Sequence, residues 1–309
     1  MRILILGAGG TGGYFGGRLA EAGADVTFLV RPKRAALMAE KGLRIQSPAG
    51  DVTLKVKTVT ADSITGTWDV ILLSCKAYDL EDAIASIRPA MGPDSLVLPI
   101  LNGLAHYPIL DAAFGKERVL GGLCHIFAAL GPDGEIVHMN TIHRLTFGER
   151  HGGTSPRTEA IARAFAPSRA EHRHSPDLMQ EAWEKYVLLT PLAGMTCSLR
   201  ADVGTIMATG DGEALTREMF EECAAVAAHA GHAPRDEARK LALGFLTQKG
   251  SAMTASMLRD LEAGGPTEGD HIVGDMLRRA RASGIATPLL RVALAHLQAY
   301  EIRRQAMAR

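Results

Sequence analysis

The first residues of the chain carry a glycine pattern that could bind phosphate groups. It follows a short apolar run, residues 2–6, and has the spacing G-x-G-x-x-G: Gly7-Ala8-Gly9-Gly10-Thr11-Gly12. In such a loop the first glycine permits a tight turn, the second lets the backbone approach a pyrophosphate, and the third lets a helix pack closely on a strand. The anion then lies on N–H groups at the N-terminus of the helix. The pattern predicts a dinucleotide site; the alternative is a tight glycine turn without a ligand.

The residue after the second predicted strand bears on which dinucleotide binds. A site for NAD usually places Asp or Glu there, which accepts a hydrogen bond from the ribose 2′-hydroxyl. Here the strand 26–30 is followed by Arg31, and a guanidinium matches the geometry of a 2′-phosphate. The sequence therefore predicts NADPH as the cofactor. The alternative is that Arg31 simply faces solvent at the start of a helix.

Two further apolar runs end in polar residues. Cys75-Lys76 follows the run 70–74, and Asn102-Gly103 follows the run 96–101. Ligands of a doubly wound sheet bind beyond the carboxyl ends of its strands, so the lysine and the asparagine are candidates for binding. The ordinary alternatives stay open, because most lysines are surface groups and Asn-Gly is a common turn pair.

A lysine in the second half of the chain could supply a proton. Lys185 lies in Trp183-Glu184-Lys185-Tyr186, which leads into the apolar stretch 187–189. A lysine that faces a cleft can protonate a carbonyl oxygen as it becomes an alkoxide. The alternative is a surface lysine whose stem lies along an apolar helix. Ser256 and Glu268 also lie in this half, and each would be ordinary if seen singly.

The elements around these residues alternate between strands and helices in the first half. Near-continuous apolar runs, such as 70–74 and 96–101, are typical of strands that helices cover on both faces. Repeated strand–helix–strand order indicates a parallel, doubly wound sheet. After about residue 176, stretches rich in Ala, Leu and Glu between glycine and proline breaks indicate successive helices. We therefore predict an α/β protein with an NADP-binding Rossmann-type domain over residues 1–175 and an all-helical substrate domain over 176–309.

Two local elements bear on where the candidate residues lie. Gly131-Pro132-Asp133-Gly134 separates the apolar stretches 126–130 and 136–139, which is typical of a hairpin turn. The stretch 178–200 predicts the helix that carries Lys185. These elements place the candidates on a regular scaffold.

Composition excludes several classes of function. The chain has 309 residues with 34 Lys+Arg and 34 Asp+Glu, so it lacks the basic surface that nucleic-acid binding needs. No apolar run reaches the ~20 residues that span a bilayer. The four cysteines have no Cys-x-x-Cys spacing, which suits a reducing compartment. We expect a cytoplasmic protein with a small-molecule substrate, no membrane or nucleic-acid partner, and no metal site, because its histidines lack partners at ligand spacing.

Taken together, these residues resemble the ketopantoate reductase (2-dehydropantoate 2-reductase) family over nearly the whole chain. The matching pieces occur in the family's order and spacing: Gly7–Gly17, Arg31, Cys75-Lys76-Ala77-Tyr78, Leu101-Asn102-Gly103, Trp183-Glu184-Lys185, Ser256-Met257-Leu258-Arg259-Asp260 and Thr267-Glu268. The resemblance implies reduction of a 2-oxo acid to a 2-hydroxy acid with NADPH, first of all ketopantoate to pantoate. It implies that Arg31 and Lys76 serve the 2′-phosphate end of the cofactor. The helical domain that it also implies could support a homodimer.

The resemblance gives a role to each remaining candidate. Lys185 would be the general acid that protonates the keto oxygen as hydride reaches the carbon. Asn102 would lie at the nicotinamide and the substrate. Ser256 would bind the region of the substrate carboxylate, and Glu268 would accept a hydrogen bond from the substrate or orient the lysine.

One departure from the family bears on the substrate. Members that make pantoate carry asparagines one and two helical turns after the lysine, where this chain has Leu189 and Ala193, with Pro191 between them. A site built to hydrogen-bond a hydroxyl differs sharply in selectivity from an apolar one. We therefore expect a more apolar carbonyl substrate, unless Thr190 or Thr196 replaces the missing amides. Two other interpretations stay open: a related two-domain dehydrogenase of the opine or 3-hydroxyacid type, and a non-enzymatic NADPH-binding redox sensor.

Overall fold

The structure is a computed structural model that describes residues 1–307, and the chain forms two compact units. Unit 1 contains Met1–Leu101 and His106–Met179, whereas unit 2 contains Asn102–Ala105 and the described chain from Gln180 onward. The sequence predicted a boundary after residue 175, and that division stays a prediction. Within residues 1–307, no helix has both the length and the apolar character needed to cross a membrane.

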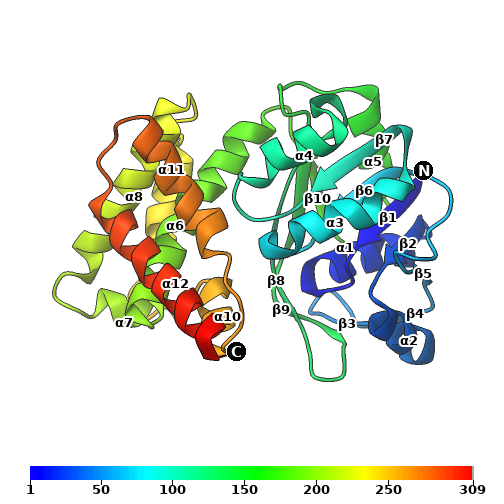
Figure 1. Ribbon diagram of the computed structural model, residues 1–309, viewed down its shortest axis with the longest axis horizontal. Coiled ribbons are helices and arrows are strands. Elements are labelled where there is room, and N and C mark those ends of the chain that lie inside the picture. The colour runs from blue at the N-terminus through cyan, green and yellow to red at the C-terminus, as the bar shows by residue number, and fades with distance from the viewer. Residues whose placement is uncertain (308–309) are drawn as a thin grey trace. The chain divides into compact units, whose positions relative to one another are not determined.

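Unit 1 is built on a parallel sheet with the strand order β5-β2-β1-β6-β7 (Figure 1). Its strands are β1 (Arg2–Leu6), β2 (Asp25–Leu29), β5 (Lys57–Val59), β6 (Trp68–Leu73) and β7 (Met91–Pro99), and its helices are α1 (Gly10–Glu21), α2 (Pro32–Lys41), α3 (Leu80–Ile87), α4 (His106–Phe114) and α5 (Pro156–Phe165). The chain passes from β1 to β2 on one side and later returns to β6 on the other side of β1. Strand order therefore reverses between β1 and β6, and ligands bind outside the carboxyl ends of strands at such a point. The predicted Rossmann-type sheet is confirmed.

A second sheet in unit 1 packs on α1 (Figure 1). Its strands are β3 (Leu43–Gln46), β4 (Val52–Leu54), β8 (Gly121–Leu130), β9 (Ile136–Gly148) and β10 (Glu171–His174). Glycines let α1 approach both sheets, because a Cβ on Gly16 would lie 2.7 Å from Ile5 and one on Gly17 would lie 2.6 Å from Ile45. The antiparallel β8–β9 hairpin has its turn at residues 131–134, where the sequence predicts it.

Unit 2 is helical, as predicted (Figure 1). Its elements are α6 (Leu178–Leu199), α7 (Val203–Met207), α8 (Gly212–His229), α9 (Asp236–Leu246), α10 (Ser256–Glu262), the π-helical segment η4 (Asp270–Gly274), α11 (Asp275–Ala282) and α12 (Pro288–Met307). Helix α8 packs on α11 and α12, and Phe220, Met276 and Leu290 are fully buried. Pro191 does not end α6, so Lys185 lies in the middle of a continuous helix.

Candidate dinucleotide and active site

The glycine-rich loop joins β1 to α1 and turns tightly. Gly7 has φ +88°, a conformation that favours glycine, and its N–H donates to Leu29 O at 3.0 Å. A Cβ on Gly12 would lie 2.6 Å from Gly7 O and would also collide with Ser74 Oγ. Both positions therefore require glycine for physical reasons, and those reasons match the roles of the first and third glycines in a dinucleotide loop.

The middle of the same loop is open. A Cβ on Gly9 would have no heavy atom within 4 Å. Gly9 is also the N-cap of α1 and contributes no side-chain cap, so the first N–H groups of the helix, from Gly10 to Gly12, are suited to an anionic ligand. Ala8 is buried beneath this surface. The residues of the loop thus fit the pyrophosphate of a dinucleotide.

Arg31 and Lys76 follow two strands of the parallel sheet. Arg31 is the N-cap of α2, its side chain is 81% exposed, and its Nη2 lies 3.5 Å from Asp79 Oδ1. Lys76 is the N-cap of a short 3₁₀ turn, Ala77–Asp79. The chain after β2 and the chain after β6 therefore meet at an ion pair. Asp79 was not predicted from the sequence to lie near Arg31. The available signal was its position three residues after Lys76, in the stretch that follows β6.

The predicted proton donor meets Asn102 within unit 2. Lys185 Nζ donates to Asn102 Oδ1 at 3.0 Å, although 83 residues separate the two in sequence. Lys185 lies on α6, and Asn102 begins the short stretch that follows Leu101, where Gly103 has φ +78°. The amide oxygen restricts the direction in which the ammonium points.

Glu268 and His271 lie in the same part of unit 2. Glu268 is 7% exposed, and its charge acts on the imidazole of His271. His271 donates a hydrogen bond to the backbone of Asn102, and a Cβ on Gly103 would lie 3.3 Å from His271 Cδ2. His271 was not predicted from the sequence, although its spacing of three residues from Glu268, typical of one helical face, was the available signal.

The environment of His271 favours a neutral imidazole. Burial lowers the pKa of His271, while the carboxylates of Glu268 and Asp275 act in the opposite direction. The segment η4 that carries His271 is tied to α6 by Tyr186, whose hydroxyl donates to Ile272 O at 2.6 Å. A neutral imidazole adds no positive charge beside Asn102. His271 therefore does not repel the ammonium of Lys185, which is hydrogen-bonded to the Asn102 side chain.

The threonines that could replace the family's asparagines are used by the helix itself. Thr190 Oγ1 and Thr196 Oγ1 each donate to the carbonyl four residues earlier, at 3.0 Å and 2.6 Å, and both residues are fully buried. Ala193 is also buried, and Leu189 is half-buried. The face of α6 after Lys185 is therefore apolar. Ser256 is the exposed first residue of α10.

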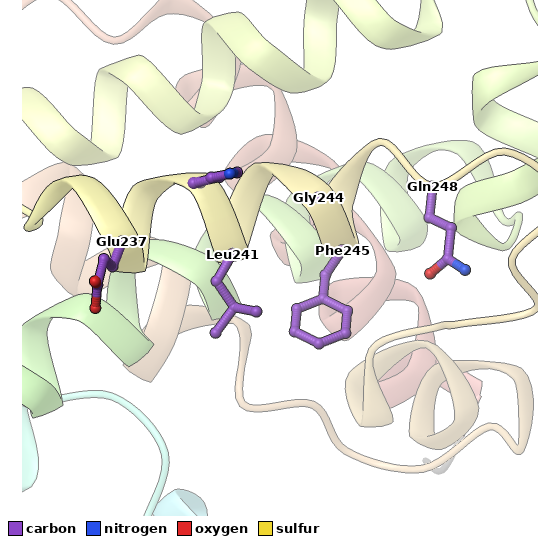
Figure 2. A pocket seen from close by; sticks show the side chains of 6 residues that line it. Glu237, Leu241, Gly244, Phe245 and Gln248 are labelled. Atoms are coloured by element: carbon purple, nitrogen blue, oxygen red, sulfur yellow. The ribbon is translucent and has the colours of Figure 1, made fainter.

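A surface hollow on α9 lies outside this group of residues. It has a volume of about 400 Å³ and is lined by Glu237, Lys240, Leu241, Gly244, Phe245 and Gln248. Leu241 and Phe245 project from the same face of the helix (Figure 2). None of the predicted site residues lines it. Within residues 1–307, no group of three or more His, Cys, Asp or Glu side chains is arranged to hold a metal ion.

Transfer of a hydride to a carbonyl needs a place for the dinucleotide and a group that gives a proton to oxygen. The loop in unit 1 fits the dinucleotide, and Lys185 in unit 2 is the predicted proton donor; this combination is typical of a pyridine-nucleotide-dependent oxidoreductase. Comparison with known families agrees. The description "Ketopantoate reductase PanE/ApbA" matches residues 3–152, and "Ketopantoate reductase PanE/ApbA C terminal" matches residues 177–301. The chain belongs to the ketopantoate reductase family.

Individual relatives show how far the likeness extends. The chain is 40% identical to an uncharacterized oxidoreductase of Bacillus subtilis over 97% of its own length and 99% of the relative. The crystal structure of 2-dehydropantoate 2-reductase from Methylococcus capsulatus is similar at a TM-score of 0.87 and 29% identity, with 98% of each chain covered. A D-mandelate dehydrogenase, solved with NADH and anilino(oxo)acetate, has the same fold at a TM-score of 0.87 and 22% identity over 99% of this chain and 100% of that one. The fold by itself therefore does not decide the substrate.

Proposed function

We propose that the protein reduces a 2-oxo acid to a 2-hydroxy acid with NADPH, and that Lys185 gives the proton. The observation that carries the proposal is the 3.0 Å hydrogen bond from Lys185 Nζ to Asn102 Oδ1, which orients the ammonium and so supports its role as the proton donor. The bound nicotinamide supplies hydride to the carbonyl carbon. In unit 1, the open backbone at Gly9 supports binding of the dinucleotide at the glycine-rich loop.

In this proposal, each candidate residue of unit 2 has a separate role in the transfer of the proton to the substrate or in binding the substrate. As negative charge builds on the keto oxygen, Lys185 Nζ releases a proton to it. Asn102 Oδ1 accepts a second hydrogen of the ammonium and keeps Nζ aimed. Glu268, which is buried, is proposed to accept a hydrogen bond from the substrate or to orient the lysine. Ser256, exposed on α10, is proposed to contact the substrate carboxylate.

The preference for NADPH over NADH is part of the proposal. Arg31 is exposed, and its ion pair with Asp79 is long enough at 3.5 Å to be exchanged for a 2′-phosphate. Lys76 begins the turn that contains Asp79 and brings a second positive charge to this edge of the sheet. A carboxylate at Asp79 would also repel the added phosphate, so the two basic residues must outweigh it.

There are two candidate substrates: the first is ketopantoate, the first guess from the family, and the second is a more apolar 2-oxo acid, which we expect to be the better substrate. The second candidate is favoured by Leu189 and Ala193, which replace the family's asparagines, and by the buried, helix-bonded hydroxyls of Thr190 and Thr196. An apolar pocket wall loses the hydrogen bonds that would select the hydroxyl group of ketopantoate.

The test is NADPH oxidation across a panel of 2-oxo acids: ketopantoate, 2-oxoisovalerate, 2-oxo acids with longer alkyl chains, and phenylglyoxylate. We expect turnover of at least one, with a higher kcat/KM for an apolar member than for ketopantoate. Efficient turnover of ketopantoate with no better substrate would contradict the apolar preference. Tight NADPH binding with no turnover of any 2-oxo acid would contradict the enzymatic proposal and favour a sensor.

A further inference from the structure

We propose that Arg34 is a positioning residue for the dinucleotide, because it orients the peptide between Ala8 and Gly9. Arg34 lies in the first turn of α2 and is half-buried within unit 1. Its Nη2 donates to Ala8 O at 2.9 Å, and its Nη1 donates to Gly134 O at 2.6 Å. One guanidinium thus joins the glycine-rich loop to the turn of the β8–β9 hairpin.

The geometry of the peptide bond gives this contact a consequence. The chain has no cis peptide bond among residues 1–307, so the Ala8 carbonyl and the Gly9 N–H point in opposite directions across a planar unit. Holding Ala8 O on the side of Arg34 therefore turns the Gly9 N–H to the other side. A Cβ on Gly9 would meet no atom within 4 Å, so the loop is open at this residue. Arg34 acts on the anion through this N–H.

The hairpin provides a firm second anchor for the guanidinium. Gly134 has φ +76°, and a Cβ there would lie 2.7 Å from Arg34 Nη1. The strand that leads into the turn presses on the same loop, because a Cβ on Gly10 would lie 2.5 Å from Ala128 O. The loop thus contacts both Arg34, at Ala8, and the backbone of β8, at Gly10.

Burial shows that Arg34 is not an ordinary surface arginine. Desolvation lowers the pKa of Arg34, and the nearby charge of Arg44 acts in the same direction. A buried cation is costly unless its hydrogens are bound, and the two carbonyls compensate part of that cost. The rigid fork of a guanidinium can reach two carbonyls at once, which the single ammonium of lysine does not reproduce.

The proposal separates Arg34 from Arg31 by what each recognises. Arg31 is proposed to read the 2′-phosphate, which only NADPH carries. Arg34 acts on the loop that meets the pyrophosphate, which NADPH and NADH share. Loss of Arg34 should therefore weaken both cofactors by the same factor, whatever the carbonyl substrate is.

The experiment is a fluorescence titration of Arg34→Met with NADPH and with NADH, without substrate. We expect each Kd to rise about tenfold, the size of one hydrogen bond to a charged group. At saturating NADPH, kcat should stay within about twofold of the wild-type value, because a positioning role at the pyrophosphate changes binding rather than the chemical step. A rise in Kd for NADPH alone would overturn the proposal and make Arg34 a ligand of the 2′-phosphate. No rise for either cofactor would also overturn it.

Arg44→Met is the matched control. Arg44 Nη2 donates to Asp133 O at 2.7 Å, so it anchors the same hairpin turn without bonding to the glycine-rich loop. We expect Arg44→Met to leave both Kd values unchanged, and an equal loss in both variants would assign the effect to the hairpin in general. Arg34→Lys keeps the charge and serves if Arg34→Met does not fold. It should restore the affinity only in part, and full affinity in this variant would overturn the role of the fork.

Discussion

The two regions that carry the proposed chemistry are built in opposite ways. The glycine-rich loop of unit 1 is six consecutive residues, Gly7–Gly12, and its turn depends on the positive φ of Gly7 and on the close approach of Gly12 to Gly7 O. The proposed proton-donating group of unit 2 draws Lys185, Asn102, Glu268 and His271 from three separate stretches of chain. The first region is specified by local backbone geometry, whereas the second is specified by packing of α6 against η4. Substitutions should therefore damage them in different ways.

The largest expected effect is on chemistry in unit 2. Lys185→Ala should lower kcat by about 10²–10⁴-fold, the usual contribution of general acid–base catalysis, because the keto oxygen then lacks its proton donor. The Kd for NADPH should hardly change, since the loop lies in unit 1. Lys240→Ala, at an exposed position on α9, is the control and should leave kcat unchanged. Wild-type turnover by a folded Lys185→Ala variant would show that Lys185 is a surface lysine on an apolar helix.

The next effect concerns the choice of cofactor in unit 1. Arg31→Ala should weaken NADPH about tenfold to a hundredfold, since charge-assisted hydrogen bonds contribute ~1.5–3 kcal/mol, and should leave NADH nearly unchanged. Isothermal titration with both nucleotides measures this directly. Equal losses for the two cofactors would contradict recognition of the 2′-phosphate. Asp79→Asn should do the reverse and improve NADPH binding, because it removes a negative charge 3.5 Å from Arg31.

A pair of alanine substitutions in the glycine-rich loop separates a glycine that the fold requires from one that only the dinucleotide requires. Gly12→Ala should destabilise the fold by about 1–3 kcal/mol, because its Cβ would collide with Gly7 O and Ser74 Oγ. Gly9→Ala has open space and should change stability by less than about 0.5 kcal/mol, yet it should weaken both dinucleotides because the methyl enters the approach of the pyrophosphate. Urea unfolding and nucleotide titration separate the two effects. A Gly9→Ala variant with wild-type affinity would place the pyrophosphate elsewhere.

The smallest effect is a pH dependence of stability from the interior of unit 1. Burial lowers the pKa of His143, with His138 and Arg18 acting in the same direction and Glu171 opposing them. His143 Nδ1 is hydrogen-bonded to the Tyr14 hydroxyl at 2.7 Å. Because the folded pKa lies below the ordinary value of about 6.5, the unfolded chain binds more protons as the pH falls. This contribution to stability is complete above the unfolded pKa and is lost progressively as the pH falls through the folded pKa.

Urea unfolding on either side of this window measures the effect. His143→Gln should flatten the decline of the free energy of unfolding between about pH 7.5 and about pH 5, whereas the exposed His151→Gln should leave it unchanged. An identical slope in wild type and His143→Gln would remove His143 as its source. Neither variant should change kcat, in contrast to the effect of Lys185→Ala in unit 2.

The sequence determined the parts of the protein whose signals are local. Apolar runs specified the strands β1, β2 and β6 and the carboxyl-terminal part of β7, and the turn at residues 131–134 specified the β8–β9 hairpin. The spacing from Gly7 to Gly12 specified the loop, because the positive φ of Gly7 and the close approach of Gly12 to Gly7 O are demands that arise within the loop itself. The helical half followed from composition and breaks. Lys185 could be singled out as a candidate proton donor because a lysine in an apolar helix is unusual in itself, and that role stays a prediction.

Only the tertiary structure decided the remaining features, because they depend on contacts between distant residues. The strands β3, β4 and β10 are three or four residues long, too short to show a period, and they form by pairing in the second sheet. Asp79 comes to Arg31 from another loop, and His271 comes to Asn102 from across unit 2. Arg34 looks in sequence like one of several basic residues at the start of a helix. Its burial against Ala8 and Gly134 exists because the sheet brings those carbonyls together, and no local pattern records it.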